Sequence, residues 1–338
     1  MKLYRIEQFG SVDGLKRLEE GTPQPRGQEV LVRIRAASLN YRDLVVLRGQ
    51  YDRNPQPGRV PLSDGAGEVV AVGDQVKRFK PGEAVAGCFF QGWDAGRFRR
   101  EMHRTALGGG IDGVLAEFVL FHEQGLVHLP AGYTFEEGAT LPCAALTAWQ
   151  SLVVRGRILP GEAVLLLGTG GVSIFGLQLA KAAGARAIIT SSSDEKLERA
   201  RSLGADHTIN YRNVSDWGRT AAELAGDEGV DHVVEVGGAG TFPESVRACR
   251  SGASIGVIGV LTGRETSVQL FTIVPKLLSV YGIYVGSREM FKDMNRTLSQ
   301  ARLKPVVDRV FAFEEAPHAY RYLESGAHLG KVVIRVSD

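Results

Sequence analysis

The distribution of hydrophobic and polar residues divides the chain into three parts. From residue 1 to about 130, short runs that alternate or are wholly apolar are interrupted by Gly and Pro, as in 29–35 and 67–73. This pattern is typical of strands in a mostly antiparallel sheet. From about 144 to 286, an apolar run, a turn and a helical repeat follow one another several times. The remaining 52 residues, 287–338, mix the two patterns.

The middle part predicts a parallel sheet. An apolar strand at 162–167 is followed by helical periodicity over 172–183, and a strand at 187–190 is followed by a helix at 194–203. Further strands are predicted at 207–210, 231–236, 253–258 and 279–285. Strands that are apolar on both faces and alternate with helices indicate a doubly wound parallel sheet, so the fold class is α/β.

The tail predicts a return to the first part. Its pattern gives a helix at 290–302, a strand at 307–311, a helix at 314–323 and a strand at 331–336. We expect it to fold back onto the first domain, with the parallel-sheet domain inserted between. The predicted domains are therefore a catalytic domain over 1–143, a dinucleotide-binding domain over 144–286, and a return segment over 287–338 that completes the catalytic domain.

Charge and cysteine content exclude several classes of protein. Lys plus Arg number 40 and Asp plus Glu 38, a balance that does not favour nucleic-acid binding. Cys88, Cys143 and Cys249 form no C-x-x-C pair, which argues against a disulfide scaffold and favours a reducing compartment. The N-terminus has no apolar segment of a secretory signal, and no apolar run reaches the roughly 20 residues of a membrane helix. We expect a cytoplasmic protein without membrane or nucleic-acid partners.

A glycine-rich turn after the first strand of the middle part predicts a nucleotide site. Gly168 permits a tight turn, and Gly170 lets the backbone approach a pyrophosphate. The N-terminus of the following helix offers N–H groups and partial positive charge to that anion. The third glycine of the usual fingerprint is replaced by Ser173, and Gly176 lies one turn further on to supply close packing. The predicted contacts of this turn are Gly168, Thr169, Gly170, Gly171 and Val172.

The end of the second strand bears on which dinucleotide binds. An NAD site usually places an acidic residue here for the ribose 2′-hydroxyl, but the nearest acids, Asp194 and Glu195, lie just beyond the strand. The strand end instead carries hydroxyls, with a lysine nearby for a 2′-phosphate. The residues concerned are Ser191, Ser192, Ser193 and Lys196. Alternatively, the serines merely cap the helix that begins near Asp194. We expect NADPH (NADP+) rather than NADH.

Six motifs in the same order resemble the medium-chain dehydrogenase/reductase superfamily over essentially the whole chain. They are Ala37–Asp43, Ser63–Val69, Asp74–Glu83, Ala139–Trp149, the turn at Gly168, and Gly330–Val333. The resemblance implies a GroES-like catalytic domain, mostly antiparallel β, into which a Rossmann domain is inserted. That architecture agrees with the expectation from the hydrophobic pattern.

Zinc-dependent members of that superfamily bind their catalytic metal with a Cys, a His and a second Cys. The corresponding positions here are Asn40, Ser63 and Cys143, so only the last matches. One thiol with an amide and a hydroxyl is a poor zinc site. The four-cysteine lobe of the family is also absent, because residues 91–113 contain no cysteine. The resemblance therefore implies a zinc-free member, similar to NADPH:quinone oxidoreductases and enone reductases, and we expect no metal.

Without a metal, reduction of an acceptor that is already polarised is the most accessible chemistry, such as a quinone or an α,β-unsaturated ketone. Asn40 is the first candidate to donate a hydrogen bond to the acceptor, and Tyr41 is a candidate proton donor. Asp43 and Asp64 are polar groups of the same motifs. Each has a structural alternative: Asn40 fixing a loop, Tyr41 packing, Asp64 holding backbone, and Cys143 filling space.

The resemblance implies further contacts with the cofactor, outside the glycine turn. These fall at Thr147, Tyr211, Val236, Gly237, Gly259, Val260 and Lys331. It also implies a homodimer, because the strand at 279–285 often pairs with its copy in a second subunit. The arginine-rich segment 92–112 forms either a basic lid over the substrate or a solvated surface loop.

Two other functions remain open at this point. One is an alcohol or carbonyl dehydrogenase that recruits a metal at Cys143 together with Asp64 or Glu68. The other is a non-catalytic NADPH-binding sensor.

Overall fold

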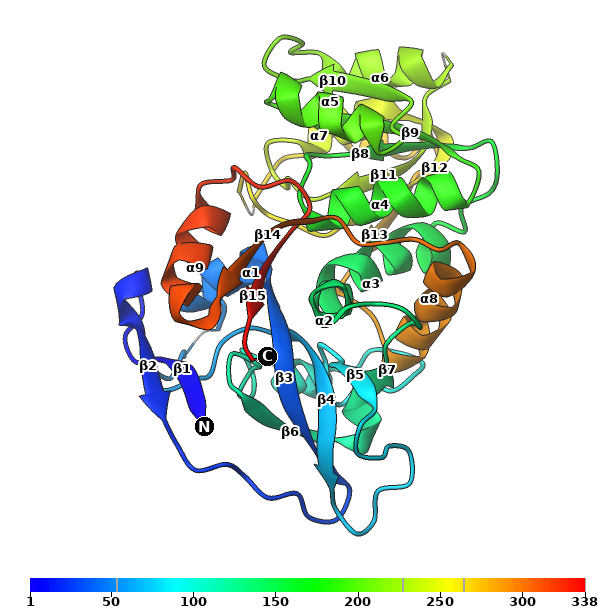
Figure 1. Ribbon diagram of the computed structural model, residues 1–338. Helices are drawn as coiled ribbons and strands as arrows, with labels where there is room; N and C mark the ends of the chain where they lie inside the picture. The colour runs from blue at the N-terminus through cyan, green and yellow to red at the C-terminus, as the bar shows by residue number, and fades with distance from the viewer. Residues whose placement is uncertain (53, 227, 264, 338) are drawn as a thin grey trace. The chain divides into compact units, whose positions relative to one another are not determined.

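The chain folds into two compact units, of which the second is inserted into the first. A computed structural model describes residues 1–52, 54–226, 228–263 and 265–337. The first unit comprises Met1–Leu146 and Gly286–Asp338, and the second comprises Thr147–Val285 (Figure 1). Within the described ranges, no helix has both the length and the apolar character that crossing a bilayer requires.

The first unit is built on a large sheet with strand order β14-β15-β3-β4-β5-β7, and β6 also pairs with β3. Its neighbouring strands are antiparallel except for β14 and β15, which are parallel. The strands are β3 (Glu29–Leu39), β4 (Asp64–Val72), β5 (Ala84–Gly87), β6 (Phe118–His122), β7 (Leu126–His128), β14 (Val307–Ala312) and β15 (Lys331–Arg335). The return segment therefore adds two strands to the sheet that the N-terminal part begins.

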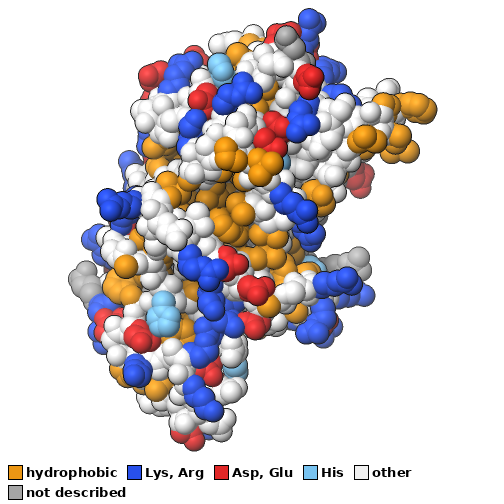
Figure 2. All heavy atoms as spheres, turned by 90° about the vertical axis from the view of Figure 1, so that its right-hand side faces the viewer, with side chains coloured by type: hydrophobic (Ala, Val, Ile, Leu, Met, Phe, Trp, Pro, Cys, Tyr) orange, Lys and Arg blue, Asp and Glu red, His pale blue; other side chains and the backbone are white. Residues whose placement is uncertain are grey.

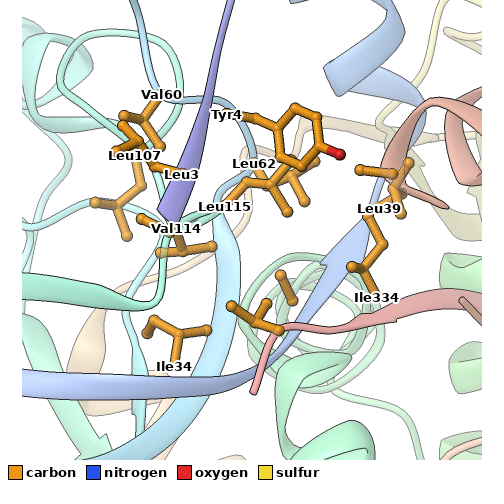
Figure 3. Packing of buried hydrophobic residues seen from close by; sticks show 14 of the residues in the cluster. Leu3, Tyr4, Ile34, Leu39, Val60, Leu62, Leu107, Val114, Leu115 and Ile334 are labelled. Atoms are coloured by element: carbon orange, nitrogen blue, oxygen red, sulfur yellow. The ribbon is translucent and has the colours of Figure 1, made fainter. Parts of the chain in front are cut away.

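Helices and a small hairpin complete this unit. The hairpin is β1 (Lys2–Ile6) with β2 (Leu15–Glu19), and the helices are α1 (Tyr41–Leu47), α2 (Phe135–Ala139), α8 (Arg288–Gln300) and α9 (Ala316–Glu324). Its core is formed by segments that are far apart in sequence. Figure 3 shows Leu3 and Tyr4 of β1 near Leu62 and Leu115, with Ile334 of β15 in the same cluster. Burial of these side chains supplies the main stabilisation of the unit.

The second unit is a six-stranded sheet in which every neighbouring pair is parallel. The strand order is β10-β9-β8-β11-β12-β13, so the order reverses between β8 and β11. The strands are β8 (Ala163–Leu166), β9 (Arg186–Ser191), β10 (His207–Asn210), β11 (Val230–Glu235), β12 (Cys249–Val257) and β13 (Ser279–Gly282). The helices are α4 (Gly171–Ala182), α5 (Asp194–Ser202), α6 (Trp217–Ala225) and α7 (Phe242–Ala248). This is the strand order of a Rossmann fold, which binds ligands where the order reverses.

The fold class predicted from the sequence is confirmed, and the differences are local. The strand predicted to reach residue 285 ends at Gly282, and Val285 has a φ of 57°, a conformation that a β-branched residue rarely adopts. Helices α1, α2, α6 and α7 were not predicted. Short α3 (Leu146–Trp149), which spans the junction of the two units, lies between π-helical turns at Leu141–Ala145 and Gln150–Arg155.

Candidate active site

Three strand ends of the first unit bring together the polar residues of its buried cluster. Asn40 follows β3, Asp64 opens β4 and Lys331 opens β15. Strand β3 pairs antiparallel with both of the other strands, so that Ser38 lies opposite Asp64 and Leu39 lies opposite Val332. The register of one sheet thus places side chains from positions 40, 64 and 331 at one place.

Lys331 holds the amide of Asn40. Its Nζ donates to the carbonyl oxygen of Leu39 and to Oδ1 of Asn40, each at 2.6 Å, and lies 4.0 Å from Oδ2 of Asp64. Only 3% of Lys331 is exposed. Because an ammonium group has only donors, it fixes which end of the amide faces it. The Nδ2 of Asn40 is buried and forms no hydrogen bond of ordinary length with a described residue, although it lies close enough to Asp64 to help hold down the pKa of that carboxyl. An amide nitrogen carries two hydrogens, which leaves a donor for a ligand.

Asp64 ties the cluster to the segment that carries Cys143. Its carboxylate accepts hydrogen bonds from Oγ of Ser63 at 2.7 Å and from the backbone N–H of Cys143 at 3.1 Å. Burial raises the pKa of Asp64, although the charge of Lys331 and these hydrogen bonds oppose that rise. Burial, followed by the nearby carboxylate of Asp64, also raises the pKa of the Cys143 thiol. The thiol therefore stays protonated at neutral pH and is a poor nucleophile.

Asp43 and Arg42 lie on the first turn of α1. Asp43 is 1% exposed and accepts a hydrogen bond from the backbone N–H of Asn40 at 2.7 Å. Its burial raises the pKa of Asp43 from 3.8 to about 6, against the opposing charge of Arg42. Nη1 of Arg42 lies 3.5 Å from Oδ1 of Asp43, and the guanidinium lies over the rings of Tyr51 and Phe89. Arg42 lies within a sequence motif but was not predicted as a site residue.

The residues at the zinc-ligand positions do not fit a zinc ion. Asn40 uses its oxygen for Lys331, Ser63 donates its hydroxyl proton to Asp64, and Cys143 is the single soft ligand among the three. A buried ammonium group also lies within this set, and it repels a cation. Glu68 was an alternative metal ligand beside Cys143. Its carboxylate pairs with Arg35 at 3.2 Å. The described part of the chain holds no group of three His, Cys, Asp or Glu arranged to bind a metal.

The nucleotide site of the second unit is the turn between β8 and α4. Gly168 has a φ of 71°, and a Cβ added at Gly168 or Gly170 would meet no atom within 4 Å. No side chain caps the first turn of α4, so its N–H groups are available to an anion. Ser173, at the position of the missing glycine, donates to the carbonyl oxygen of Leu167 at 2.6 Å. Gly176 packs against Leu166, as predicted for close helix–strand contact.

The hydroxyls at the end of β9 have structural roles of their own. Ser193 caps α5 by accepting a hydrogen bond from the backbone N–H of Lys196, and Ser191 accepts one from the N–H of Ser193. The capping alternative is therefore present in the structure, while a role in binding phosphate stays a prediction for Ser191, Ser192, Ser193 and Lys196. Asp194, the nearest carboxylate, accepts a hydrogen bond from Nδ2 of Asn210 at 2.7 Å.

Buried Glu235 organises the loop after β11. Its carboxylate accepts hydrogen bonds from the N–H groups of Gly237 and Gly238 at 2.7 and 2.9 Å, and from the hydroxyls of Thr241 and Ser245. The loop was predicted as a cofactor contact, but Glu235, the residue that shapes it, was not predicted. An acid that ends a strand one residue before two consecutive glycines was the available signal.

The structure gathers most of the predicted cofactor residues at one edge of the parallel sheet. The carboxyl ends of β8 to β12 carry Gly168 to Val172, Ser191 to Ser193, Tyr211, Val236, Gly237, Gly259 and Val260, with Lys196 on α5. Thr147 is buried in α3, and Lys331 belongs to the cluster around Asn40 in the first unit. Tyr41 opens α1 and is 44% exposed. The cofactor contacts of Thr147 and Lys331 and the proton transfer by Tyr41 stay predictions.

Segment 92–112 is partly anchored by its aromatic residues. Trp93, 4% exposed, packs edge-on against Phe98, and both lie beside Phe90. Its four arginines, at 97, 99, 100 and 104, are exposed. Both earlier alternatives, a lid and a surface loop, are compatible with this arrangement.

The parallel sheet with its open glycine turn, together with a separate unit that buries a polar cluster, defines a dinucleotide-dependent oxidoreductase. Two family models match the chain: residues 26–131 match the alcohol dehydrogenase GroES-like domain, and residues 171–300 match the zinc-binding dehydrogenase domain. The chain belongs to the medium-chain dehydrogenase/reductase superfamily, as the sequence motifs indicated.

Relatives of several activities resemble the chain over nearly its whole length. The zinc-type alcohol dehydrogenase-like protein C1773.06c of Schizosaccharomyces pombe is 43% identical, covering 98% of this chain and 97% of its own. The 2-methylene-furan-3-one reductase of Solanum lycopersicum is 34% identical (99% and 79%), and the chloroplastic NADPH-dependent alkenal/one oxidoreductase of Arabidopsis thaliana is 31% identical (99% and 79%). A solved NAD-dependent alcohol dehydrogenase is 34% identical over the whole of both chains, with a TM-score of 0.90.

The pKa of Asp43 predicts a specific pH dependence of stability. Because the folded protein holds this proton more tightly than the unfolded chain, Asp43 favours folding at low pH, and that contribution is lost as pH rises from about 4 to 6. Asp43→Asn keeps an acceptor oxygen but does not titrate. The stability of this variant relative to the wild type, measured as the difference between their free energies of unfolding, should therefore increase by up to about 3 kcal/mol between pH 4 and pH 7.

Urea denaturation at several pH values measures this difference. The control is Asp293→Asn, an aspartate of α8 whose side chain is 45% exposed. A difference for Asp43→Asn that stays constant with pH would show that the carboxyl group titrates normally.

Proposed function

We propose that this oxidoreductase uses NADPH to reduce a polarised acceptor, a quinone or an α,β-unsaturated carbonyl compound, without catalytic zinc. The observation that carries the proposal is the amide of Asn40. Lys331 occupies its oxygen at 2.6 Å, and its Nδ2, which lies near Asp64, forms no hydrogen bond of ordinary length with a described residue. A fixed hydrogen-bond donor thus stands where zinc-dependent members of the superfamily hold their first metal ligand.

The preference for NADPH rests on the end of β9. Asp194, the acid nearest to the position that binds a ribose 2′-hydroxyl in NAD sites, accepts a hydrogen bond from Asn210, while hydroxyls and Lys196 are close in sequence. The name of the Arabidopsis relative also supports NADPH, whereas the solved alcohol dehydrogenase is NAD-dependent. When bound, the reduced nicotinamide supplies a hydride.

The residues of the first unit stabilise the charge that develops on the acceptor. As a carbon atom of the acceptor gains a hydride, its conjugated oxygen gains negative charge. Asn40 donates a hydrogen bond from Nδ2 to that oxygen, and Lys331 keeps the amide in place. A proton then completes the reduction, and Tyr41 donates it or relays it from water, because the side chain is 44% exposed. Without a group that ionises an alcohol, the reverse oxidation of a simple alcohol is less favoured.

We also propose that the protein is a homodimer. Strand β13 forms one edge of the parallel sheet, and Val280 on it is 42% exposed. The preceding segment exposes further large apolar side chains: Leu270, Phe271, Val274 and Leu277, of which Phe271 is 87% exposed. Figure 2 shows hydrophobic side chains gathered on a projection of the surface. An apolar edge of this kind requires a cover, and a second copy supplies one.

The unpaired Cys88, Cys143 and Cys249 support a cytoplasmic location.

Steady-state kinetics with a panel of quinones, enones, aldehydes and alcohols tests the function. Asn40→Ala should lower kcat for the best acceptor by about 10- to 100-fold and leave the affinity for NADPH nearly unchanged, because it removes one donor to a developing oxyanion. The matched control is Asn295→Ala, whose amide binds the carbonyl oxygen of His128. Turnover of alcohols only would favour the dehydrogenase alternative, and binding of NADPH without any turnover would favour the sensor.

Lys196→Ala tests the cofactor preference. Loss of one cation near the 2′-phosphate should raise the KM for NADPH by about tenfold and change the KM for NADH by much less. Lys181→Ala is the control, since Lys181 lies in the same unit and pairs with Asp206 at 2.7 Å. Equal effects on the two cofactors would rule out the assignment of Lys196.

Light scattering after size exclusion tests the dimer. The wild type should have twice the chain mass of 36.5 kDa, and Val280→Lys should reduce it to a single chain. Val310→Lys is the control, because Val310 is similarly exposed, at 39%, on the edge strand β14 of the other sheet. A wild-type monomer, or a dimer that survives Val280→Lys but not Val310→Lys, would contradict the proposed interface.

A further inference from the structure

His232, a buried residue of the second unit, lies between a serine and a glutamate. Its Nδ1 is 2.7 Å from Oγ of Ser254, and its Nε2 is 2.8 Å from Oε2 of Glu162. Only 5% of His232 is exposed, whereas Ser254 is half-buried. The imidazole thus connects a hydroxyl on one side to a carboxylate on the other, and these three residues form a triad.

Glu162 determines which nitrogen of the imidazole carries the proton. A carboxylate only accepts hydrogen bonds, so the proton of a neutral His232 lies on Nε2. Nδ1 then has a lone pair and accepts the hydroxyl proton of Ser254. Glu162 is itself oriented, because its Oε2 also accepts a hydrogen bond from the backbone N–H of Leu159 at 2.7 Å. A serine that donates to an imidazole, which a carboxylate orients in turn, has the arrangement of an activated nucleophile.

The register of the parallel sheet brings the triad together. His232 of β11 lies opposite Val164 of β8 and opposite Ser254 of β12, and Glu162 immediately precedes β8. The pairing of β11 with β12 is irregular just before the pair of His232 and Ser254, and such irregularities re-aim side chains beside functional sites. Glu162 and His232 lie towards the amino ends of their strands, whereas the predicted cofactor residues lie at the carboxyl ends. The triad is therefore separate from the nucleotide site.

An open hollow of about 380 Å³ gives a small molecule access to the triad. All three members line it, together with Ser279 of β13. Its volume falls within the range of small-molecule sites. A Cβ added at Gly156 would lie 3.0 Å from Nδ1 of His232, so the glycine leaves room beside the nitrogen that accepts the serine proton. Ser254 thus borders a space large enough for a small ester.

Arginines in the same hollow supply positive charge. Arg155 and Arg157 line it and are exposed, and neither guanidinium forms an ion pair or hydrogen bond with a described residue. The third arginine, Arg250, pairs with Asp231. Because the acids of the hollow, Asp231 and Glu162, already have partners, the charge of Arg155 and Arg157 is available. Cations in this position stabilise the negative oxygen that forms when a hydroxyl adds to a carbonyl group.

We propose that Ser254 is a nucleophile and that this site hydrolyses esters of small carboxylic acids. Its Oγ bonds to the carbonyl carbon of the ester while its proton passes to Nδ1 of His232. The bond from that carbon to the alcohol oxygen breaks, and His232 gives the proton to this oxygen. Water then attacks the acyl-serine, His232 takes one of its protons, and Oγ leaves with that proton. The products are an acid and an alcohol, and the reaction requires no oxidant or reductant.

This activity is independent of the proposed reduction and of the proposed dimer. No step uses the nicotinamide cofactor, which is predicted to bind at the opposite ends of the strands. A second copy would pair with the free edge of β13, and β12, which carries Ser254, lies on the other side of β13. Saturating NADP+ should therefore leave the hydrolysis of an ester unchanged.

Covalent labelling tests the nucleophile. A fluorophosphonate bonds to serines that a base activates, and peptide mass spectrometry then identifies the modified residue. We expect Ser254 of the wild type to be labelled, with NADP+ present or absent. Ser279 is the internal control, because it lines the same hollow but its hydroxyl forms no hydrogen bond with a described residue. Release of 4-nitrophenol from 4-nitrophenyl acetate should continue beyond one equivalent per chain.

Variants assign the reaction to the triad. Ser254→Ala should abolish labelling and steady hydrolysis and leave the reduction of enones unchanged, whereas Ser279→Ala should behave as the wild type. His232→Asn keeps a polar group but removes the base, and should lower the rate of hydrolysis by about 100-fold. Glu162→Gln keeps an acceptor for Nε2 without the charge and should lower the rate by less. Thermal unfolding of each variant confirms that it is folded.

Several results would overturn the inference. An unlabelled Ser254 in the folded wild type would do so, as would equal labelling of Ser254 and Ser279 or undiminished hydrolysis by Ser254→Ala. If His232→Asn does not fold, an unchanged rate in Glu162→Gln would contradict the role of the imidazole. Hydrolysis of the ester by a protein that reduces no quinone or enone would support this inference and contradict only the proposed function.

Discussion

The buried ammonium group of Lys331 is the interaction on which the candidate active site depends. It is held between the carbonyl oxygen of Leu39 and the amide oxygen of Asn40, and it lies near the carboxylate of Asp64. A buried charge is tolerated only where acceptors and a counter-charge surround it, and the ends of β3 and β4 supply both. In return, the lysine fixes the orientation of the amide, so that Nδ2 of Asn40 faces away from it as a donor. A positive charge in this position also opposes the binding of a metal ion.

The same cluster balances its charges in pairs. Lys331 faces Asp64, and Arg42 faces Asp43, so that two cations accompany two acids in a buried environment. Burial raises the pKa of both carboxyl groups, which shows that desolvation outweighs the attraction of their partners. Arrangements with perturbed carboxyl groups and undersatisfied donors are typical of binding and catalytic sites rather than of a core built only for stability.

Local patterns predicted the parts of the protein that depend on local interactions. The turn at Gly168 was predictable because a tight turn after an apolar strand requires glycine, and the inserted domain followed from the repeated alternation of strand and helix. The role of Lys331 was not predictable from its neighbours. It depends on the antiparallel pairing of β15 with β3, which joins residues nearly 300 positions apart. Arg42 was missed because a charged residue on a short helix is ordinarily exposed, and only the stacking on Tyr51 and Phe89 shows that it is buried. Ser193 was assigned both to a cap and to a phosphate, and the structure shows the cap.

We infer that donors of the chain itself stand where zinc-dependent members of the superfamily hold their metal ion. The most direct test is the metal content of the purified protein, measured by mass spectrometry together with its NADPH-dependent reductase activity before and after dialysis against a chelator. We expect zinc far below one ion per chain and an activity that the chelator does not change. One zinc ion per chain that is lost together with activity, and restores activity when returned, would contradict it.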